Sequence, residues 1–442
     1  MNFDRSRVAV LAASEASLTL AETVISAGEL TEICFLLDAG DKATIQLLPV
    51  AEGLALTRVA DFSNVDACTA AVRALDPDAV VTFSDHLCGL ATHLDSALRG
   101  VNSVDPPWGR KDVQRRVLFE AGASAVRSAR VTDESALRLF ATQVGYPVVV
   151  KPTDGVASRD TWILRGETDL REFIAHGHEG DCRTAGMFAE EFIGSGPPLP
   201  GQLADYVSAE VFTADLPSRA AGHGSAFVTD RLPLAWPCRE TGLMLPSALP
   251  DEVTRLVLDR AGRALDALRA GRGVFHVEVK PRPPDPEVIE VNGRLGGFIA
   301  RLARYGANAD LGRLALACYL GRAEPMALDW RRAVVVLLFQ PPPLAARVTQ
   351  APSRREVARL PGVIAVDEIA AAGDPVDWRL GTNRAAAKIW MAASDRPDLL
   401  RLLGDAAVFL TEKFVFTDDV GRRVTEMPWV NKLVESTTGA WK

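Results

Sequence analysis

The sequence predicts a mixed α/β protein, with a parallel α/β domain at its N-terminal end, an α+β region in the middle and an α+β segment at its C-terminal end. Three observations support this prediction. A β-α-β pattern opens the chain, and strand patterns paired around polar loops occupy its middle. An apolar run at residues 333–339 then begins a last stretch in which strand-like and helix-like patterns alternate to about Phe416.

The N-terminal prediction rests on short apolar runs that alternate with helical patterns, which is typical of parallel strands buried on both faces. The first helical pattern ends at Gly28, and no G-x-G-x-x-G motif follows the first strand, so a classical dinucleotide site is not supported. We expect a domain over residues 1–105. Its strands are predicted at 8–13, 33–37 and 78–83, and its helices at 18–27 and 65–75.

The sequence Asp-Pro-Pro-Trp at 105–108 breaks the chain, and a helix is predicted just after it at 111–121, stopped by Gly122. Beyond it, two strand patterns flank a polar turn with Gly155 and predict a hairpin. A second pair of strand patterns flanks a proline-rich loop near residue 283. The strands are predicted at 146–151, 161–164, 188–193, 207–212, 274–279 and 287–292, and a long helix at 250–270.

Composition and charge exclude several classes of function. The formal net charge of −8 over 442 residues has the wrong sign for attraction to a phosphate backbone, so we expect no nucleic-acid partner. The six cysteines are far apart and lack zinc-ligand spacing, which favours reduced thiols. The first apolar run is too short for a signal peptide, and no stretch approaches a membrane span. These features predict a cytoplasmic location and no membrane partner, and they leave the oligomeric state open, a homodimer included.

The strongest chemical signal is the sequence HVEVK-PRPPDP-EVIEVNGRLGG at 276–297. Glu278 lies on one predicted strand, and Glu290 and Asn292 lie on the next, where alternation puts these two on one face. Two carboxylates and an amide oxygen that converge across a hairpin suit Mg²⁺ and leave room for nucleotide phosphates. His276 shares a strand face with Glu278, so we expect it near the site. The alternative is a pair of edge-strand acids that face solvent.

Two further segments suit an anionic nucleotide. In YPVVVKPTDGVASRD, Lys151 ends a buried strand and a loop of small residues follows, whose N–H groups can hold phosphate oxygens. In the segment 188–193, a strand stops in a loop, and the free backbone groups at its end can hydrogen-bond an adenine ring. Each segment also has an alternative interpretation. Lys151 would be a solvated surface lysine, and 188–193 would be an ordinary amphipathic strand.

Taken in this order, the motifs from Lys111 onward resemble the ATP-grasp superfamily over some two-thirds of the chain. The resemblance implies a two-lobed ATP-grasp domain over 106–330, with a small lobe at about 125–192 and a large lobe at about 193–330, and a C-terminal domain over 331–442. It implies nucleotide contacts from Lys111, Lys151, Ser158, Arg159, Glu190, Glu191, Phe192 and Ile193. It also implies Glu278, Glu290 and Asn292 as metal ligands, and Arg294 as the arginine that holds the transferring phosphoryl group.

Within the superfamily, ETGLMLPSALP at 240–250, FHVEVK and EVNGRLGG resemble the branch of L-amino acid ligases and carnosine-synthase-like enzymes. In that branch, R-x-x-G precedes a bulky residue at the amino-acid pocket. The resemblance therefore implies substrate contacts from Glu240, His276, Arg294, Gly297 and Phe298. The chain departs from the branch at Asp160, where a glycine is usual, and at Leu243, where several relatives have a histidine.

The resemblance implies an enzyme that uses ATP and Mg²⁺, with Mn²⁺ as an alternative metal, to join a small-molecule carboxylate to an amine through an acyl phosphate. Glu278, Glu290 and Arg294 would carry the catalysis. Two alternatives stay open. One is another ATP-grasp ligase or carboxylase that acts on partners other than amino acids, although no A-M-K-M-like biotinylation string is present. The other is a nucleotide-binding regulator without turnover.

Overall fold

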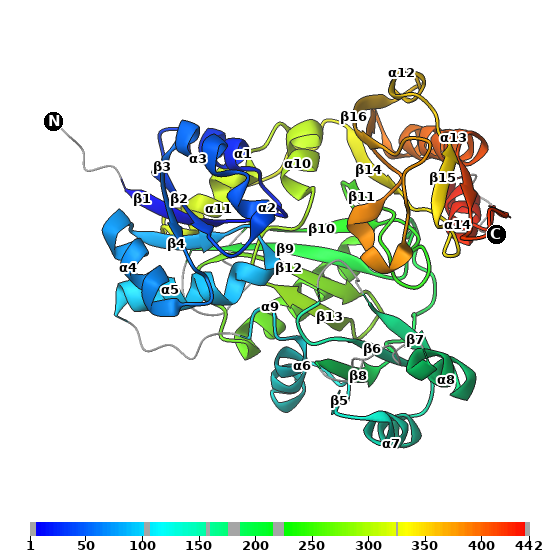
Figure 1. Cartoon of the computed structure of the whole chain (residues 1–442), viewed down its shortest axis with the longest axis horizontal. Coiled ribbons are helices and arrows are strands. Elements are labelled where there is room, and N and C mark those ends of the chain that lie inside the picture. Colours follow the sequence, from blue (N-terminus) through cyan, green and yellow to red (C-terminus); the bar gives the residue numbers. More distant parts are fainter. Residues whose placement is uncertain are drawn as a thin grey trace.

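A computed structural model describes residues 6–100, 107–155, 160–175, 186–214, 225–323 and 326–437 of the chain. Within them, an N-terminal domain, a small lobe and a C-terminal segment surround a large central sheet (Figure 1). The predicted mixed α/β class is confirmed. Ser158 and Arg159, which the resemblance implies as nucleotide contacts, lie outside the described residues.

The N-terminal domain contains a parallel sheet, as the sequence predicts, and its strands lie in the order β3-β2-β1-β4. Its inner strands are continuous apolar runs because helices cover both faces. The prediction missed β3, an edge strand with a half-exposed pattern, and the short helices α2 and α3. The elements are β1 (Arg7–Ala12), α1 (Leu20–Ala27), β2 (Glu32–Asp38), α2 (Lys42–Ile45), α3 (Leu48–Leu54), β3 (Leu56–Ala60), α4 (Val65–Leu75), β4 (Ala79–Thr82), η1 (Asp85–Leu87) and α5 (Cys88–Arg99).

The small lobe follows α6 (Lys111–Glu120) and is an antiparallel sheet in the order β5-β8-β6-β7. The predicted hairpin is confirmed, since β6 pairs with β7 in antiparallel register. Phe140 and Phe173 of two helices pack on one face of this sheet and bury it. The elements are β5 (Ser128–Val131), α7 (Glu134–Val144), β6 (Val148–Pro152), β7 (Trp162–Leu164), α8 (Glu167–Ala175) and β8 (Met187–Glu191).

The central sheet has eight strands in the order β13-β12-β9-β10-β11-β14-β17-β16, and every pairing in it is antiparallel. Helix α9 (Asp251–Ala267) packs on one face of its first half, and α10 (Ile299–Ala307) and α11 (Leu311–Tyr319) pack on the other. The strands are β9 (Val207–Thr213), β10 (Ser225–Arg231), β11 (Gly242–Leu245), β12 (Gly273–Lys280), β13 (Glu287–Asn292), β14 (Ala333–Phe339), β16 (Val363–Ile369) and β17 (Ala387–Ala393).

The C-terminal segment contributes β14, β16 and β17 to this sheet, so the sheet runs across the boundary expected at residue 330. The domain boundaries stay predictions. The remaining elements cover the sheet at the orange and red end of the molecule (Figure 1). They are β15 (Arg347–Gln350), α12 (Arg354–Val357), η2 (Trp378–Leu380), η3 (Thr382–Arg384), α13 (Arg396–Lys413), β18 (Val415–Thr417), β19 (Arg423–Val424) and α14 (Pro428–Thr437).

Two contacts fix the other parts against the central sheet. The N-terminal domain packs on α10 and α11 through a shared apolar core, and the Ser26 hydroxyl donates to Asp310 Oδ1 at 2.8 Å. Part of the contact between the small lobe and the rest is made by three tryptophans: the ring of Trp378 lies 5.8 Å from that of Trp162 and 4.6 Å from that of Trp236. Among the described residues, no helix is long and apolar enough to cross a membrane.

Candidate active site

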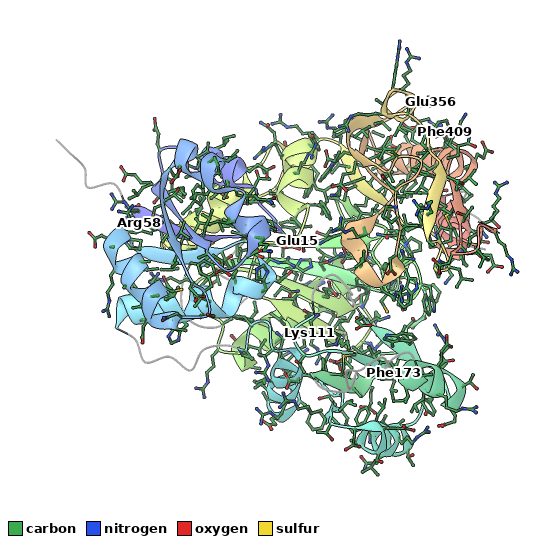
Figure 2. The ribbon with its side chains drawn as sticks, in the orientation of Figure 1. Glu15, Arg58, Lys111, Phe173, Glu356 and Phe409 are labelled. Atoms are coloured by element: carbon green, nitrogen blue, oxygen red, sulfur yellow. The ribbon has the colours of Figure 1, made fainter. Side chains whose placement is uncertain are left out.

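A cavity of about 1700 Å³ lies where the N-terminal domain, the small lobe, the central sheet and the C-terminal segment meet. In the view of Figure 2, Lys111 and Glu15, which both line the cavity, lie near the middle of the molecule, whereas Arg58 and Glu356 lie toward its edge. Every candidate site residue that the structure describes lines this one cavity. They are Lys111, Lys151, Glu190, Glu191, Phe192, Ile193, Glu240, His276, Glu278, Glu290, Asn292, Arg294, Gly297 and Phe298.

The β12–β13 hairpin brings the expected metal ligands together. Its register pairs Glu278 with Glu290 and His276 with Asn292. The register then shifts beyond Glu278, so that Val279 pairs with Val288. Such a bulge changes which side chains face which side. Here it lets Val288 pack under α9 while Glu290 still faces the cavity.

Two carboxylates placed directly opposite on neighbouring strands repel each other unless a cation lies between them. In this structure, Lys111 Nζ lies 2.7 Å from Glu290 Oε2, and Arg231 Nη2 lies 3.6 Å from Glu278 Oε1. Burial by itself would lower the pKa of Lys111, but Glu290 outweighs it and raises this pKa above its ordinary value. Burial opposes the charged form of Glu278, yet the neighbouring Arg231 guanidinium holds its pKa below the ordinary value. Glu278 is therefore a carboxylate at neutral pH.

The hairpin also fits a magnesium ion chemically. Glu278, Glu290 and Asn292 offer two carboxylates and an amide oxygen on one face, and Mg²⁺ takes the rest of its six oxygens from phosphates and water. Among the described residues, no group of three or more His, Cys, Asp or Glu side chains is arranged to hold a metal. The protein would thus supply only part of the coordination shell, as sites shared with a nucleotide do.

His276 sits in a buried network below the hairpin. Burial would lower its pKa, but Glu210 raises it to about 9, which favours a protonated ring. However, Arg231 Nη2 lies 2.8 Å from His276 Nε2, and a guanidinium nitrogen can only donate. Two N–H groups cannot face each other at that distance, so His276 Nε2 has to accept the hydrogen bond. The ring is therefore neutral, with its proton on Nδ1, toward Glu210.

Glu210 also ties the R-x-x-G loop to the central sheet. Its Oε2 accepts the Gly296 N–H at 3.1 Å. A Cβ at position 296 would come within 2.5 Å of His276 Nδ1 and 2.7 Å of Glu210 Oε1, so only glycine allows this close approach. The loop that carries Arg294 is thereby held against β9 and β12.

On the small-lobe side, Lys151 is part of a buried ion-pair network. Lys151 Nζ lies 2.6 Å from Glu190 Oε1, and Arg115 Nε donates to Glu190 Oε2 at 2.9 Å. Burial would raise the pKa of Glu190, but the two cations outweigh it and lower the pKa. Arg115 also donates to the carbonyl oxygens of residues 288 and 289. The network therefore joins α6, the small lobe and β13.

The segment expected to bind adenine lines the adjacent part of the cavity. Glu191 pairs with Arg127, and the Phe192 N–H donates to the Pro147 carbonyl at 3.4 Å. Lys280 Nζ lies 5.6 Å from the centre of the Phe192 ring and pairs with Asp205. Ile193 is almost fully buried. This end of the cavity combines apolar side chains with polar groups, as an adenine site requires.

Arg294 makes a contact that the sequence did not predict. Its Nε and Nη2 lie 2.5 and 2.6 Å from the two carboxylate oxygens of Asp85, which follows β4 in the N-terminal domain. Burial opposes the charged form of Asp85, but Arg294 outweighs it and lowers the pKa of this carboxyl. Arg294 Nη1 donates to the Leu295 carbonyl. Asp85 thus links the N-terminal domain to the loop that carries Arg294, where the reaction is expected.

The two departures from the family pattern have clear structural settings. Asp160 adopts φ of 53°, a left-handed conformation that glycine takes freely and that Asp tolerates better than most residues. It therefore reproduces the backbone shape for which the usual glycine is suited. Leu243 is buried in the apolar core beneath the N-terminal domain and does not line the cavity, so it offers no substrate contact.

Several charged residues that the fold brings into the site were not predicted, because the local sequence pattern around each of them is weak. Asp85 follows the carboxyl end of a parallel strand, a position at which ligands often bind. Glu210 lies among apolar residues on β9 and pairs with His276, which is distant in sequence, and Arg231 ends β10. The missed residues that take part in the contacts above are Asp85, Arg115, Asp205, Glu210, Arg231 and Lys280.

Comparison of sequences finds curated relatives. The chain is 27% identical to carnosine synthase 1 of Mus musculus over 261 residues, which are 57% of this chain and 29% of that protein. It is 34% identical to carnosine synthase 1 of Gallus gallus over 127 residues, which are 28% of this chain and 14% of that protein. The matched segment thus spans less than a third of either relative. No protein-family model matches the chain.

Comparison with solved structures covers nearly the whole chain. The L-amino acid ligase from Bacillus licheniformis superposes with a TM-score of 0.66 at 15% identity, over 94% of this chain and 99% of that one. A carboxyaminoimidazole ribonucleotide synthase complexed with ATP, from Aspergillus clavatus, superposes with a TM-score of 0.64 at 15% identity, over 92% of this chain and 99% of that one. The chain therefore has the ATP-grasp fold of these solved structures, and part of its sequence is similar to the carnosine synthases.

Proposed function

We propose that the protein is an ATP-dependent carboxylate–amine ligase that forms an amide bond between an amino acid and an amine or second amino acid, and releases ADP and phosphate. The observation that carries the proposal is the pairing of Glu278 with Glu290 across one hairpin, in a cavity that also holds Lys111, Lys151 and Arg294. This arrangement gathers positive groups and metal-ligating oxygens around a space large enough for a nucleotide and two small substrates.

In this proposal, the nucleotide lies between the small lobe and the hairpin. Lys151 and Lys111 contact its phosphates, and residues 190–193 contact its adenine. Glu278, Glu290 and Asn292 would hold Mg²⁺, which would neutralise charge on the phosphates of ATP, the source of the phosphoryl group. Lys111 now pairs with Glu290, so it has to exchange part of that contact for a phosphate oxygen when the nucleotide binds.

The residues around Arg294 would then activate the acid. A carboxylate is a poor electrophile until one oxygen becomes a leaving group, and transfer of the γ-phosphoryl to it gives an acyl phosphate. Arg294 has the planar fork that suits a phosphoryl group or carboxylate. The amine attacks the carbonyl carbon, the C–O bond to phosphate breaks, and the ammonium proton is released. The rate gain comes from alignment and charge neutralisation, without a protein nucleophile.

The test is phosphate and ADP release with ATP, Mg²⁺ and pairwise pools of amino acids and simple amines, with the coupled product identified by mass. We expect release only when an acid and an amine are both present, or when an acid is present with hydroxylamine as a trap. The absence of release across broad pools, with a protein that binds ATP, would contradict a ligase and favour a nucleotide-binding regulator.

We expect Lys151→Ala to weaken ATP binding by about tenfold or more, because a point charge beside the phosphates is lost. Arg115 still pairs with Glu190 in this variant, so the small lobe should keep its fold. The measurement is a calorimetric titration of the folded variant with a non-hydrolysable ATP analogue. Lys413→Ala is the control, since Lys413 lies 3.8 Å from Glu356 outside the cavity. Equal affinities for the two variants would remove Lys151 from the nucleotide site.

Phe298 limits the space for the amine in this proposal. It adopts φ of 68°, which is rare for an aromatic residue, and its ring lies 5.9 Å from that of Trp390 at the cavity surface. We expect Phe298→Ala to raise the rate ratio of a large to a small amine by about tenfold, the scale on which apolar pockets discriminate. Acyl phosphate formation, measured with hydroxylamine, should change little because its contacts lie elsewhere.

A purely structural role for Phe298 would give a different result. Truncation of a fully buried Phe costs about 3–5 kcal/mol, whereas Phe298 is half-buried and should cost less. Phe227 is the matched control, a half-buried aromatic that packs on Phe212 and Trp330 outside the cavity. If Phe298→Ala and Phe227→Ala lower the melting temperature alike and both leave the rate ratio unchanged, Phe298 does not border the amine.

A further inference from the structure

One end of the cavity, next to Phe298, is formed by helix α10 and strands β16 and β17. It contains Arg301, which has no role in the reaction proposed above. Arg301 lines the cavity on α10, and Asp367 and Trp390 line it from β16 and β17. Arg301 Nη1 lies 2.9 and 2.8 Å from the two carboxylate oxygens of Asp367. Its guanidinium carbon lies 4.3 Å from the centre of the Trp390 ring.

Only some of the N–H groups of Arg301 donate to an acceptor. A guanidinium has five N–H groups. In Arg301, Nε donates to the Tyr305 hydroxyl at 3.0 Å, and the two hydrogens of Nη1 serve the two oxygens of Asp367. Within the described part of the chain, Nη2 has no hydrogen-bond acceptor. The two N–H groups of Nη2 therefore remain on a side chain that borders the cavity.

The surroundings hold this arginine in one orientation before any ligand binds. Asp367 accepts a third hydrogen bond from Trp390 Nε1 at 2.7 Å, and Trp390 is almost fully buried. The guanidinium plane is thus fixed by a carboxylate, a hydroxyl and an aromatic face that belong to three different elements. The neighbouring cation, Lys388, donates to Glu368 Oε1 at 2.7 Å. A guanidinium that is already oriented and keeps two free N–H groups loses little entropy when it binds an anion.

We propose that Arg301 binds a carboxylate of the amine substrate, so that the amine is itself an amino acid or another amine that carries an acid group. This inference rests on the proposed ligase activity and makes its second substrate more specific. Phe298 and Trp390 supply an apolar surface beside the arginine for the body of that molecule. The amine that attacks would face Arg294, and its carboxylate would face the opposite end.

The acid substrate does not fit this position. Its carboxylate has to lie beside the transferring phosphoryl group, where Glu278, Glu290 and Arg294 gather. Arg301 lies on the other side of Phe298 along the chain and makes its contacts with the C-terminal strands. In this proposal, a carboxylate held by Arg301 serves recognition only. Arg301 is therefore a binding residue and takes no part in bond formation.

The test compares amines that differ only in the carboxylate. Standard L-amino acids and their carboxamides serve as amines for wild-type protein, Arg301→Met and Arg301→Lys, with one fixed acid. We expect wild-type protein to prefer the amino acids, and Arg301→Met to raise their KM by about 10- to 100-fold, the scale of a lost charged hydrogen-bond pair. The KM of the carboxamides should stay nearly constant. Arg301→Lys should recover part of the preference, because it keeps the charge without the fork.

Arg304→Met is the matched control, since it removes the same charge from the same helix outside the cavity. If Arg301→Met affects amino acids and carboxamides equally and lowers the melting temperature, the residue merely joins α10 to the C-terminal strands, and the inference is wrong. If wild-type protein turns over no pair of substrates, the ligase proposal fails instead. Thermal-shift titration with the same two sets of compounds then decides whether Arg301 binds carboxylates.

Discussion

Replacement of Glu290 by Gln should leave a folded protein that has lost turnover by a factor of about 100 or more. A neutral amide holds Mg²⁺ far less well than a carboxylate, and metal stabilisation of the phosphoryl charge is worth several kcal/mol. At ~1.4 kcal/mol for each factor of ten, a loss of about 3 kcal/mol gives this ratio. The variant also frees Lys111 from its ion pair, so nucleotide affinity should fall less than turnover.

The measurement is the rate of phosphate release as a function of Mg²⁺ concentration, together with the melting temperature. Glu287→Gln on the same strand is the control, because Glu287 is buried and does not line the cavity. Normal turnover of Glu290→Gln at saturating Mg²⁺ would show that this carboxylate is not a metal ligand. A collapse of the melting temperature would show that the Lys111–Glu290 pair holds the fold.

The sequence predicted those elements whose signal is local. Alternation and a proline-rich loop were enough to predict the β12–β13 hairpin, and continuous apolar runs were enough for β1, β2 and β4. Pairing between strands that are far apart in sequence has no such signal. Strand β14 was predicted as an apolar run, but only the structure shows that it pairs with β11 and extends the central sheet.

The same limit applies to the candidate site. Glu278, Glu290 and Asn292 lie on one hairpin, so a period of two was sufficient to predict their shared face. The bulge that keeps Glu290 toward the cavity was not predictable, because it depends on how β12 and β13 pair. Glu190 was expected only as part of an adenine-binding edge, and its side chain instead joins Lys151 and Arg115 in a buried ion pair. Ion-pair partners from other elements are fixed by tertiary packing, which the local pattern does not contain.

Arg294 shows why such a partner matters for interpretation. The sequence resemblance implies that it holds the transferring phosphoryl group, whereas the structure shows its fork bound to Asp85 of the N-terminal domain. Both roles are compatible if a phosphoryl group competes with Asp85 for the guanidinium. They predict different results when each partner is changed separately.

Arg294→Lys should lower kcat/KM by about 100-fold or more, because a point charge cannot replace a planar fork where a phosphoryl group has to be held, and arginines in this role are worth large factors. Asp85→Asn keeps the fork and removes only the competing charge, so it should retain most of the activity. Phosphate release at saturating ATP and the melting temperature should be measured for both variants. If Asp85→Asn loses as much activity as Arg294→Lys, the arginine acts by holding the N-terminal domain in place. If Arg294→Lys retains normal activity, it does not contact the phosphoryl group.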